Sequence, residues 1–138
     1  TLLIERYRRK KAAHLYGVDI FGEAIEGARE NAGKANVPSY FINKDFVEFS
    51  HSYTFDEVIT ELPAGSDKMT PDVLMTLYKS FVRKLNQWMT PGGYVIVVTT
   101  EKEYLLSLAA RSGYLKAEKE WALSGKKEQY VVVLRYRG

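Results

Sequence analysis

The chain has 138 residues and no cysteine, which excludes disulfide bonds, thiolate metal sites and cysteine nucleophiles. Its 46% hydrophobic and 27% charged residues are typical of one soluble globular domain, and the net charge of +3 is modest. Because no apolar run approaches the ~20 residues that span a bilayer and no secretory signal pattern opens the chain, a cytoplasmic protein without a membrane partner is expected.

The first part of the chain alternates between helix and strand patterns. Apolar residues within 2–12 can share one helical face, and "HLYGVDI" is a strand candidate that ends in Asp19. Residues 21–35 predict a second helix that lies close to a sheet, and residues 39–43 predict a short strand with Asp45 just past its end. The residues at helical spacing in this second helix are Ala24, Ile25, Ala28, Ala32 and Ala35.

The middle of the chain predicts an irregular segment, a strand and a long helix. Residues 47–53 show no regular pattern, whereas "TFDEVIT" at 54–60 predicts a strand that leads to Glu61. Thr70 followed by Pro71 favours a helix start, with threonine as the N-cap and proline at the first helical position. The helix then carries an apolar stripe of Leu74, Leu77, Tyr78, Phe81, Leu85 and Trp88.

The last third of the chain predicts a central strand, a helix and a hairpin. "TPGG" at 90–93 is expected to end the long helix, because proline cannot continue it and the glycines permit a turn. "YVIVVTT" at 94–100 is apolar on both faces, as central strands of parallel sheets are. A helix is expected at 101–114, and the tail predicts two strands, "LKAEKEWAL" and "QYVVVLRYR", joined by a hairpin at 124–127.

This alternation predicts an α/β fold in which helices cover both faces of a parallel sheet that ends in an antiparallel pair. Ligands of such sheets bind outside the carboxyl ends of the strands, where the strand order reverses. Asp19, Asp45 and Glu61 lie at three of these carboxyl ends. We therefore expect three carboxylates to converge on one edge of the sheet, around a pocket shaped for a nucleoside.

The acidic strand ends, "TPGG" before a hydrophobic strand and the terminal hairpin together resemble the class I S-adenosylmethionine-dependent methyltransferases. The similarity is greatest to the RNA methylases that modify guanine N2 in tRNA or rRNA, usually behind an RNA-binding THUMP domain. It runs from "TLLIE" through "GVDI", "ARENAG", "KDF" and "LNQWMTPGG" to "VVTTEKEYLL". The resemblance implies a Rossmann-like fold, S-adenosyl-L-methionine as the cofactor, RNA as a partner and methyl transfer to an exocyclic amine.

The resemblance also implies which residues bind the cofactor. Asp19, with the neighbouring Ile20, would hold the ribose, since a carboxylate after the second strand of the complete sheet can accept two hydroxyl groups. Asp45 and Phe46 would hold the adenine, through its exocyclic amine and its ring face. Helix-capping roles for the two aspartates and a core position for Phe46 would explain the same pattern without a ligand.

The segment Glu61-Leu62-Pro63-Ala64 stands where amino-methylating relatives have Asn or Asp, Pro-Pro, and Tyr or Phe. Glu61 and the backbone carbonyl of Leu62 or Pro63 are therefore the candidates to accept hydrogen bonds from the target amine. Ala64 cannot stack on a flipped base, and Leu62 in place of proline is expected to loosen the loop. A solvated carboxylate, or the remnant of a lost site, is the alternative for Glu61.

A further departure concerns the glycine-rich motif of the family, D-P-F-C-G-S-G-T, which precedes a segment like "TLLIE". Because that segment begins here at Thr1, residues 1–138 are expected to be a methyltransferase domain without its first strand and cofactor-wrapping loop. The strands at 14–19 and 55–60 then lack a shared neighbour. They either pair directly or receive a strand from another chain, for example in a homo-oligomer.

Other chemistry receives less support from the sequence. His14 and His51 have no partner at ligand spacing, so no metal site is predicted. The basic run at 6–11 and the basic residues at 126–137 suit RNA phosphates, but this signal is nonspecific, and a solvated helix face and a solvated hairpin are the favoured explanation. Tyr78 is expected in the core rather than against a base.

Two other function classes stay open at this point. A methyltransferase-like fold without activity could serve as an RNA-binding or assembly module, which Ala64 and the missing glycine loop favour. A nicotinamide-dependent oxidoreductase also carries an acid after its second strand. The terminal antiparallel hairpin argues against the oxidoreductase.

Overall fold

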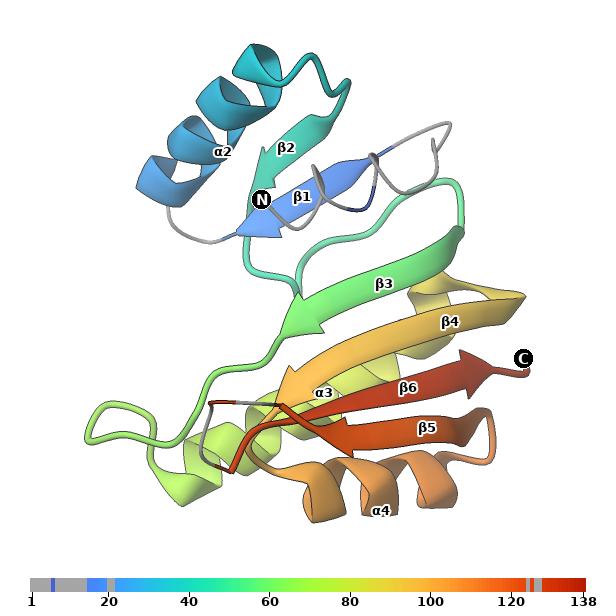
Figure 1. Ribbon diagram of the computed structural model, residues 1–138. Coiled ribbons are helices and arrows are strands. Elements are labelled where there is room, and N and C mark those ends of the chain that lie inside the picture. The colour runs from blue at the N-terminus through green and yellow to red at the C-terminus, as the bar shows by residue number, and fades with distance from the viewer. Residues whose placement is uncertain (1–5, 7–14, 20–21, 124, 126–127) are drawn as a thin grey trace. The chain divides into compact units, whose positions relative to one another are not determined.

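The computed structural model describes residues 6, 15–19, 22–123, 125 and 128–138 (Figure 1). The helix expected at 2–12 therefore lies outside the described residues, except for the helical Arg6. The chain forms two compact units, Thr1–Phe49 and Ser50–Gly138. No helix among the described residues is both long enough and apolar enough to cross a membrane.

The first unit consists of two short parallel strands connected by a helix. Strand β1 (Tyr16–Asp19) pairs in register with β2 (Tyr40–Asn43), so the last residues of the two strands lie opposite each other. Helix α2 (Gly22–Lys34) connects them, and its buried residues are Ile25 in the first half and Ala32 in the second half. Within the described residues, the strand that leads to Asp19, the helix predicted at 21–35 and the strand predicted at 39–43 are confirmed.

The buried face of α2 is narrower than the sequence predicted. Ala24 is exposed and Ala28 is only half-buried, whereas Ile25 and Ala32 are buried. Successive residues of an α-helix are rotated by about 100° from each other, so Ala24 faces away from the direction of Ile25. Its inclusion in the sheet-facing stripe was wrong, because spacing alone does not show where a stripe is centred.

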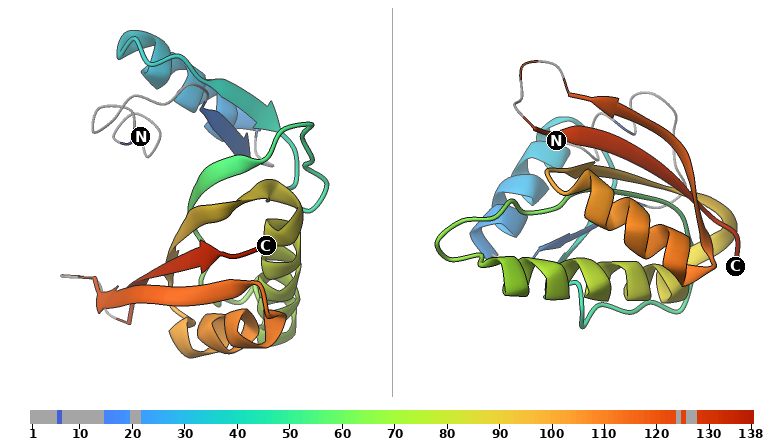
Figure 2. Two further views of the ribbon diagram at one scale, coloured as in Figure 1. Left: turned by 90° about the vertical axis from the view of Figure 1, so that its right-hand side faces the viewer. Right: turned by 90° about the horizontal axis from the view of Figure 1, so that it is seen from below.

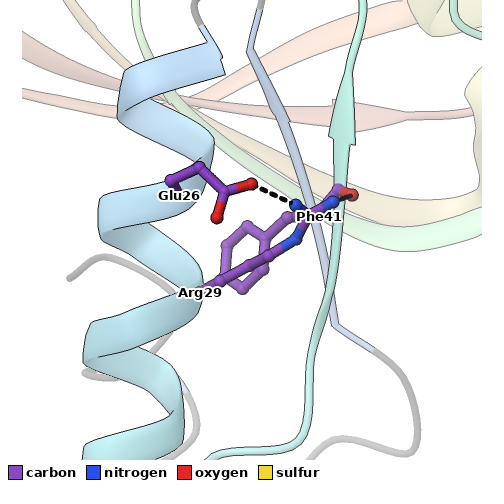
Figure 3. Close-up of polar contacts among 3 residues, drawn as sticks. All are labelled: Glu26, Arg29 and Phe41. Atoms are coloured by element: carbon purple, nitrogen blue, oxygen red, sulfur yellow. Dashed lines mark hydrogen bonds and ion pairs between the residues drawn. The ribbon is translucent and has the colours of Figure 1, made fainter.

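An arginine joins α2 to the neighbouring strand (Figure 3). Arg29 donates through Nη2 to the backbone carbonyl of Phe41 at 3.1 Å and through Nη1 to Oε1 of Glu26 at 2.6 Å. The side chains of Arg29 and Glu26 are 51% and 72% exposed, so the ion pair itself contributes little to stability. The bond to Phe41 matters more for geometry, because it connects the helix to the backbone of β2.

The second unit contains a four-stranded sheet in the order β3-β4-β6-β5. Strand β3 (Phe55–Glu61) is parallel to β4 (Met89–Thr99), while β6 (Tyr130–Tyr136) is antiparallel to both β4 and β5 (Leu115–Ala122). The predicted closing hairpin is confirmed. Its last strand lies between β4 and β5, so the chain returns into the sheet rather than extending it at the edge.

Two helices cover one face of this sheet, α3 (Pro71–Trp88) and α4 (Lys102–Ser112) (Figure 2). Thr70 caps α3 as predicted, since its hydroxyl accepts a hydrogen bond from the N–H of Val73. Of the predicted stripe, all members are buried except the half-buried Leu77, and Val82 joins them. From the sheet, the same core receives Val95, Val97, Val132 and Leu134, each with no exposed surface.

The segment "TPGG" does not end α3 by itself. The helix already ends at Trp88, and β4 begins at Met89 and runs through the proline and both glycines. The ladder with β3 is irregular here, and a Cβ added to Gly93 would lie 2.8 Å from the carbonyl oxygen of Asp56. The function of this glycine is thus to permit a close approach of two strands, which a turn prediction did not anticipate.

Strand β5 lies at one end of the four-stranded sheet, opposite β3. All its residues after Leu115 are exposed, and the ladder to β6 shifts between Ala117 and Lys119. Lysine and glutamate fill half of its positions. Lys102 of α4 links this strand to the helix layer, because its Nζ lies 3.1 Å from Oε1 of Glu120 and 4.4 Å from the ring centre of Tyr130.

The strands of the two units belong to separate sheets. Among the described residues, β1 pairs only with β2, and β3 pairs only with β4. Direct pairing between the strands predicted at 14–19 and 55–60 would join the two units, and it stays a prediction. A strand supplied by another chain, as in a homo-oligomer, stays a prediction.

Candidate functional site

Two of the predicted acidic residues stand at one edge of the first sheet. Asp19 is the last residue of β1 and stands opposite Asn43, the last residue of β2. Adjacent strands of a sheet are about 4.8 Å apart, so the ends of β1 and β2 are close to each other. Asp45 comes two residues after Asn43 and therefore lies just beyond the end of β2. The structure thus brings Asp19 and the Asp45 turn to the same carboxyl edge, while Ile20 lies outside the described residues.

Asp45 begins a turn and uses part of its carboxylate there. Its Oδ1 accepts a hydrogen bond from the N–H of Val47 at 3.1 Å, and its backbone carbonyl accepts one from Glu48 at 3.0 Å. The capping role considered from the sequence is therefore present. The second carboxylate oxygen makes no hydrogen bond within the described residues, so it remains able to accept one from a ligand.

Phe46 is half-buried, whereas Phe49 in the same turn is only 6% exposed. The core position considered for Phe46 is thus filled by Phe49. A partly exposed ring next to Asp45 suits a planar ligand, because the ring supplies an apolar face beside a hydrogen-bond acceptor.

These residues fit the nucleoside part of S-adenosyl-L-methionine. A nucleoside requires acceptors for the ribose hydroxyls and for the exocyclic amine of the base, together with an apolar wall. Among the residues predicted for these contacts, Asp19 is an acidic residue at a strand end, and Asp45 and Phe46 offer a carboxylate oxygen and a half-buried ring. The donor set is therefore chemically suitable for this cofactor.

The third predicted carboxylate, Glu61, is the last residue of β3 in the second unit. It is exposed and paired in register with Val98 of β4. Since Asp19 and Asp45 belong to the first unit, convergence of all three carboxylates is not tested by the structure and stays a prediction. Within its own unit, Glu61 stands at the carboxyl end of a parallel strand, as expected.

The loop after Glu61 is held more firmly than the sequence indicated. Leu62 donates its N–H to the carbonyl of Val98 at 3.0 Å, and its side chain is 6% exposed. The expectation that leucine loosens this position was wrong, because proline has no N–H and could not make this hydrogen bond. Pro63 and Ala64 follow as exposed residues.

A pocket of about 270 Å³ lies beyond this loop, at the N-terminal turns of α3 and α4. Both helices begin on the side of the sheet where β3 and β4 end (Figure 1). Its lining includes Gly65, Met69, Leu74, Met75, Glu101 and Tyr104. A turn shapes its rim, because the N–H of Ser66 donates to the carbonyl of Met69 at 3.0 Å and the N–H of Met69 donates back to Ser66.

A buried polar network positions one wall of this pocket. The hydroxyls of Tyr78 and Thr99 are 2.5 Å apart, and Oγ1 of Thr99 accepts from the backbone N–H of Glu101 at 2.9 Å. Burial, with a smaller contribution from the charge of Glu101, raises the pKa of Tyr78. Tyr78 is fully buried, so its predicted place in the core is confirmed.

Sequence reasoning missed Glu101 and Tyr104. The signal was present, since Glu101 follows the end of β4 just as Asp45 follows β2 and Glu61 ends β3. Applying the carboxyl-end rule to every parallel strand would have found this fourth acid. Tyr104 had no such signal, because an aromatic residue on a helix is most often a core residue.

Within the described residues, no group of three or more metal-ligand side chains is present. His14 lies outside this part of the chain. His51 packs against the rings of Tyr53 and Phe55, at 5.5 and 5.6 Å between ring centres, and its Nδ1 accepts from the N–H of Tyr53. These contacts give His51 a structural role in the segment that precedes β3.

Residues 3–129 match the family described as the RMKL-like methyltransferase domain. The chain belongs to this family. No curated protein sequence matches it significantly. Because the family consists of methyltransferase domains, the nicotinamide-dependent oxidoreductase is not supported. The antiparallel β6 agrees, since a dinucleotide-binding sheet is built of parallel strands.

Several solved structures share the fold. The N-methyltransferase NodS from Bradyrhizobium japonicum, solved with S-adenosyl-L-homocysteine, has a TM-score of 0.66 at 15% identity over 96% of this chain and 73% of its own. A class I S-adenosylmethionine-dependent methyltransferase candidate from Listeria monocytogenes has a TM-score of 0.75 at 15% identity, over 99% of this chain. A methylase candidate from Clostridium difficile has a TM-score of 0.67 at 24% identity, over 97% of this chain.

At these identities the comparison establishes the fold, which is the predicted Rossmann-like methyltransferase fold. This chain spans 49% of the Listeria protein and 35% of the Clostridium protein. Family and fold together make S-adenosyl-L-methionine the cofactor of this class of domain, as the sequence resemblance implied.

Proposed function

We propose that this domain, within its complete protein, methylates the exocyclic N2 amine of a guanine in tRNA or rRNA with S-adenosyl-L-methionine as donor. The observation that carries the proposal is the adjacency of two acidic strand ends, Asp19 on β1 and Asp45 beyond β2, in a chain of the RMKL-like methyltransferase family. The presence of S-adenosyl-L-homocysteine in the NodS structure, which has the same fold, supports the choice of donor.

The proposed roles in the first unit concern binding and orientation. Asp19, with Ile20, holds the ribose hydroxyls, and the second oxygen of Asp45 accepts from the adenine amine. Phe46 packs on the adenine face. The cofactor supplies an electrophilic methyl group, and these residues fix the direction in which it points. Methyl transfer depends chiefly on such alignment, since little covalent help from the protein is required.

The proposed roles in the second unit concern the acceptor. Glu61 and the carbonyl of Leu62 or Pro63 accept hydrogen bonds from the N–H groups of the target amine, which turns its lone pair toward the methyl group. The hydrogen bond from Leu62 to Val98 holds these acceptors in place. As the new N–C bond forms, an amine proton leaves, and in this proposal the exposed carboxylate of Glu61 accepts it.

Calorimetry with S-adenosyl-L-homocysteine tests this function in the protein that includes any sequence upstream of Thr1. We expect binding, and Asp19→Ala should weaken it by about 1–3 kcal/mol because hydrogen bonds to the ribose are lost. Asp67→Ala, at an exposed loop position of the second unit, is the matched control and should bind as the parent does.

Absence of binding heat at millimolar ligand would overturn the methyltransferase proposal. If the same protein still bound tRNA or rRNA, the noncatalytic RNA-binding module would replace it, and the exposed Ala64 favours that alternative because it cannot stack on a base. Unchanged affinity in Asp19→Ala, with binding intact, would reduce Asp19 to a capping residue.

A further inference from the structure

The pocket between the loop after β3 and the helices α3 and α4 has a composition that suits one aromatic ring. Leu74, 4% exposed, forms a buried apolar surface, and Met75 is 47% exposed. The volume of the pocket, about 270 Å³, is just below the ~300–1,000 Å³ that is usual for drug-sized ligands. The pocket therefore accommodates a single ring system. Thioether side chains such as Met69 and Met75 make favourable contacts with aromatic rings.

Tyr104 forms a wall that is fixed in place. Its ring packs against Tyr78 at 5.9 Å between ring centres, and its hydroxyl points to the backbone carbonyl of Met75 at 3.5 Å. Because Tyr78 is anchored to Thr99 in the core, this wall connects to the interior of the unit. A rigid aromatic side chain beside thioethers is a suitable stacking surface for a nucleobase.

Glu101 is the charged residue in the otherwise largely apolar lining of this pocket. It is the N-cap residue of α4, yet its carboxylate makes no capping hydrogen bond. Within the described residues it has no side-chain hydrogen bond or ion pair, while its backbone N–H is fixed by Thr99. The structure thus holds an acceptor with two oxygens at the edge of a ring-sized apolar pocket.

Only one of the common nucleobases matches a carboxylate with two adjacent donors. The Watson–Crick edge of guanine carries N1–H and an N2–H that point in the same direction, so both carboxylate oxygens can accept. Adenine and cytosine place an acceptor nitrogen beside their amine, which repels the second oxygen. Uracil offers one N–H between two carbonyls.

We propose that this pocket binds a second guanine of the substrate RNA, with Glu101 accepting from its Watson–Crick edge and Tyr104, Met69 and Met75 packing on its ring. The base is a second one because the target amine must be held by Glu61 and cannot also be bound by Glu101. The source of the base, RNA, and its being a second base rest on the proposed function, whereas the selection of guanine rests on the pocket itself.

The test follows methionine methyl signals by NMR during titration with guanosine 5′-monophosphate, adenosine 5′-monophosphate and short single-stranded RNAs that differ only in one G or A. The chain has three methionines, so the spectrum includes its own control. Met69 and Met75 line the pocket, whereas Met89 is 2% exposed and lies outside it. We expect the guanine ligands to shift the first two signals and leave the third unchanged.

Glu101→Gln replaces one acceptor oxygen by a donor and should weaken guanine binding about ten-fold. Because the parent carboxylate makes no capping bond, this variant should fold normally. Glu103→Gln is the matched control, since it removes the same charge from the same helix at a side chain that is 87% exposed. It should bind as the parent does.

The proposal would be overturned if saturating guanosine monophosphate left Met69 and Met75 unshifted, if adenine ligands bound equally well, or if Glu101→Gln kept full affinity. If the mononucleotide bound as tightly as the G-containing RNA, the source would be a free guanine nucleotide, and the RNA part of the proposal would fall. Guanine binding without S-adenosyl-L-homocysteine binding would overturn the proposed function alone, and the reverse result would overturn the pocket alone.

Discussion

The two units of this chain hold their strands in different ways. In the first unit, two strands of four residues are covered by α2, whose buried side chains are Ile25 and Ala32. In the second unit, strands of seven to eleven residues pack under two helices, and side chains as large as Tyr78, Leu85 and Leu105 lose nearly all exposure. Apolar burial is the main source of stability, so the second unit should be the more stable of the two.

This difference bears on how a methyltransferase domain divides its tasks. The residues proposed to hold the cofactor stand on the small unit, where strand ends are short and polar. The loop proposed to hold the acceptor and the pocket proposed to bind guanine stand on the unit with the larger core, where Thr99 of the buried network fixes the backbone N–H of Glu101. In the proposed mechanism, the target is thus held by the unit with the larger buried core, which suits a reaction that depends on positioning.

The largest expected effect comes from the core of the second unit. Leu85 has no exposed surface, so Leu85→Ala should lower the free energy of unfolding by about 2–5 kcal/mol. Leu77→Ala on the same helix, at a half-buried side chain, should cost less. Denaturant unfolding measures both, and equal losses would contradict the view that this helix is anchored through its buried stripe.

Glycine-to-alanine changes should have opposite signs in the two units. At Gly93 the new Cβ would lie 2.8 Å from the carbonyl oxygen of Asp56, so Gly93→Ala should destabilise by about 1–3 kcal/mol. Gly27 in α2 has nothing within 4 Å of an added Cβ, and Gly27→Ala should stabilise by about 0.4–1 kcal/mol. The thermal unfolding midpoints of both variants test these two predictions. If Gly93→Ala were stabilised, β3 and β4 would separate easily at this position.

Tyr78→Phe should cost about 1 kcal/mol at neutral pH, because the bond to Thr99 is lost. Burial raises the pKa of Tyr78 in the folded state, so its stabilising contribution is complete below the unfolded pKa of about 10 and declines as the pH rises through the folded value. As the pH rises above about 10, the free energy of unfolding should therefore fall more steeply for the parent than for Tyr78→Phe. Parallel pH dependences of the two unfolding midpoints would contradict this.

The smallest effect is expected on the surface of the first unit. Glu26→Gln removes an exposed ion pair with Arg29 and should change stability by about 0–1 kcal/mol. Arg29→Met should cost more, since it also removes the hydrogen bond to the backbone of Phe41. Hydrogen exchange of the β2 amides distinguishes them, and equal protection in both variants would show that this bond does not hold the helix to the strand.

Much of the fold follows from local patterns in the chain. The cap at Thr70, the apolar stripe of α3 and the antiparallel tail all form as predicted, because each is determined by neighbouring residues. The placement of β6 between β4 and β5 did not follow, since it depends on pairing between distant segments. The strand-like "TPGG" segment likewise depends on the approach of β3.

The candidate site was predictable where one rule sufficed and missed where packing decides. Asp19 and Asp45 stand at adjacent strand ends, as the carboxyl-end rule predicts. The prediction for Leu62 was wrong because the sequence does not show that its N–H donates a hydrogen bond to the carbonyl of Val98 on another strand. The pocket around Glu101 and Tyr104 needed the contact between two helices, which no local pattern contains.

The outer strand β5 also affects how copies of this protein meet in a crowded solution. An uncovered strand offers a row of backbone donors and acceptors onto which a neighbouring molecule can add its own strand, the first step toward fibrils. Stacking copies of β5 would strip water from its lysines and glutamates and bring like charges together, and the irregularity after Ala117 interrupts the row. Addition of a further strand at β5 is therefore disfavoured.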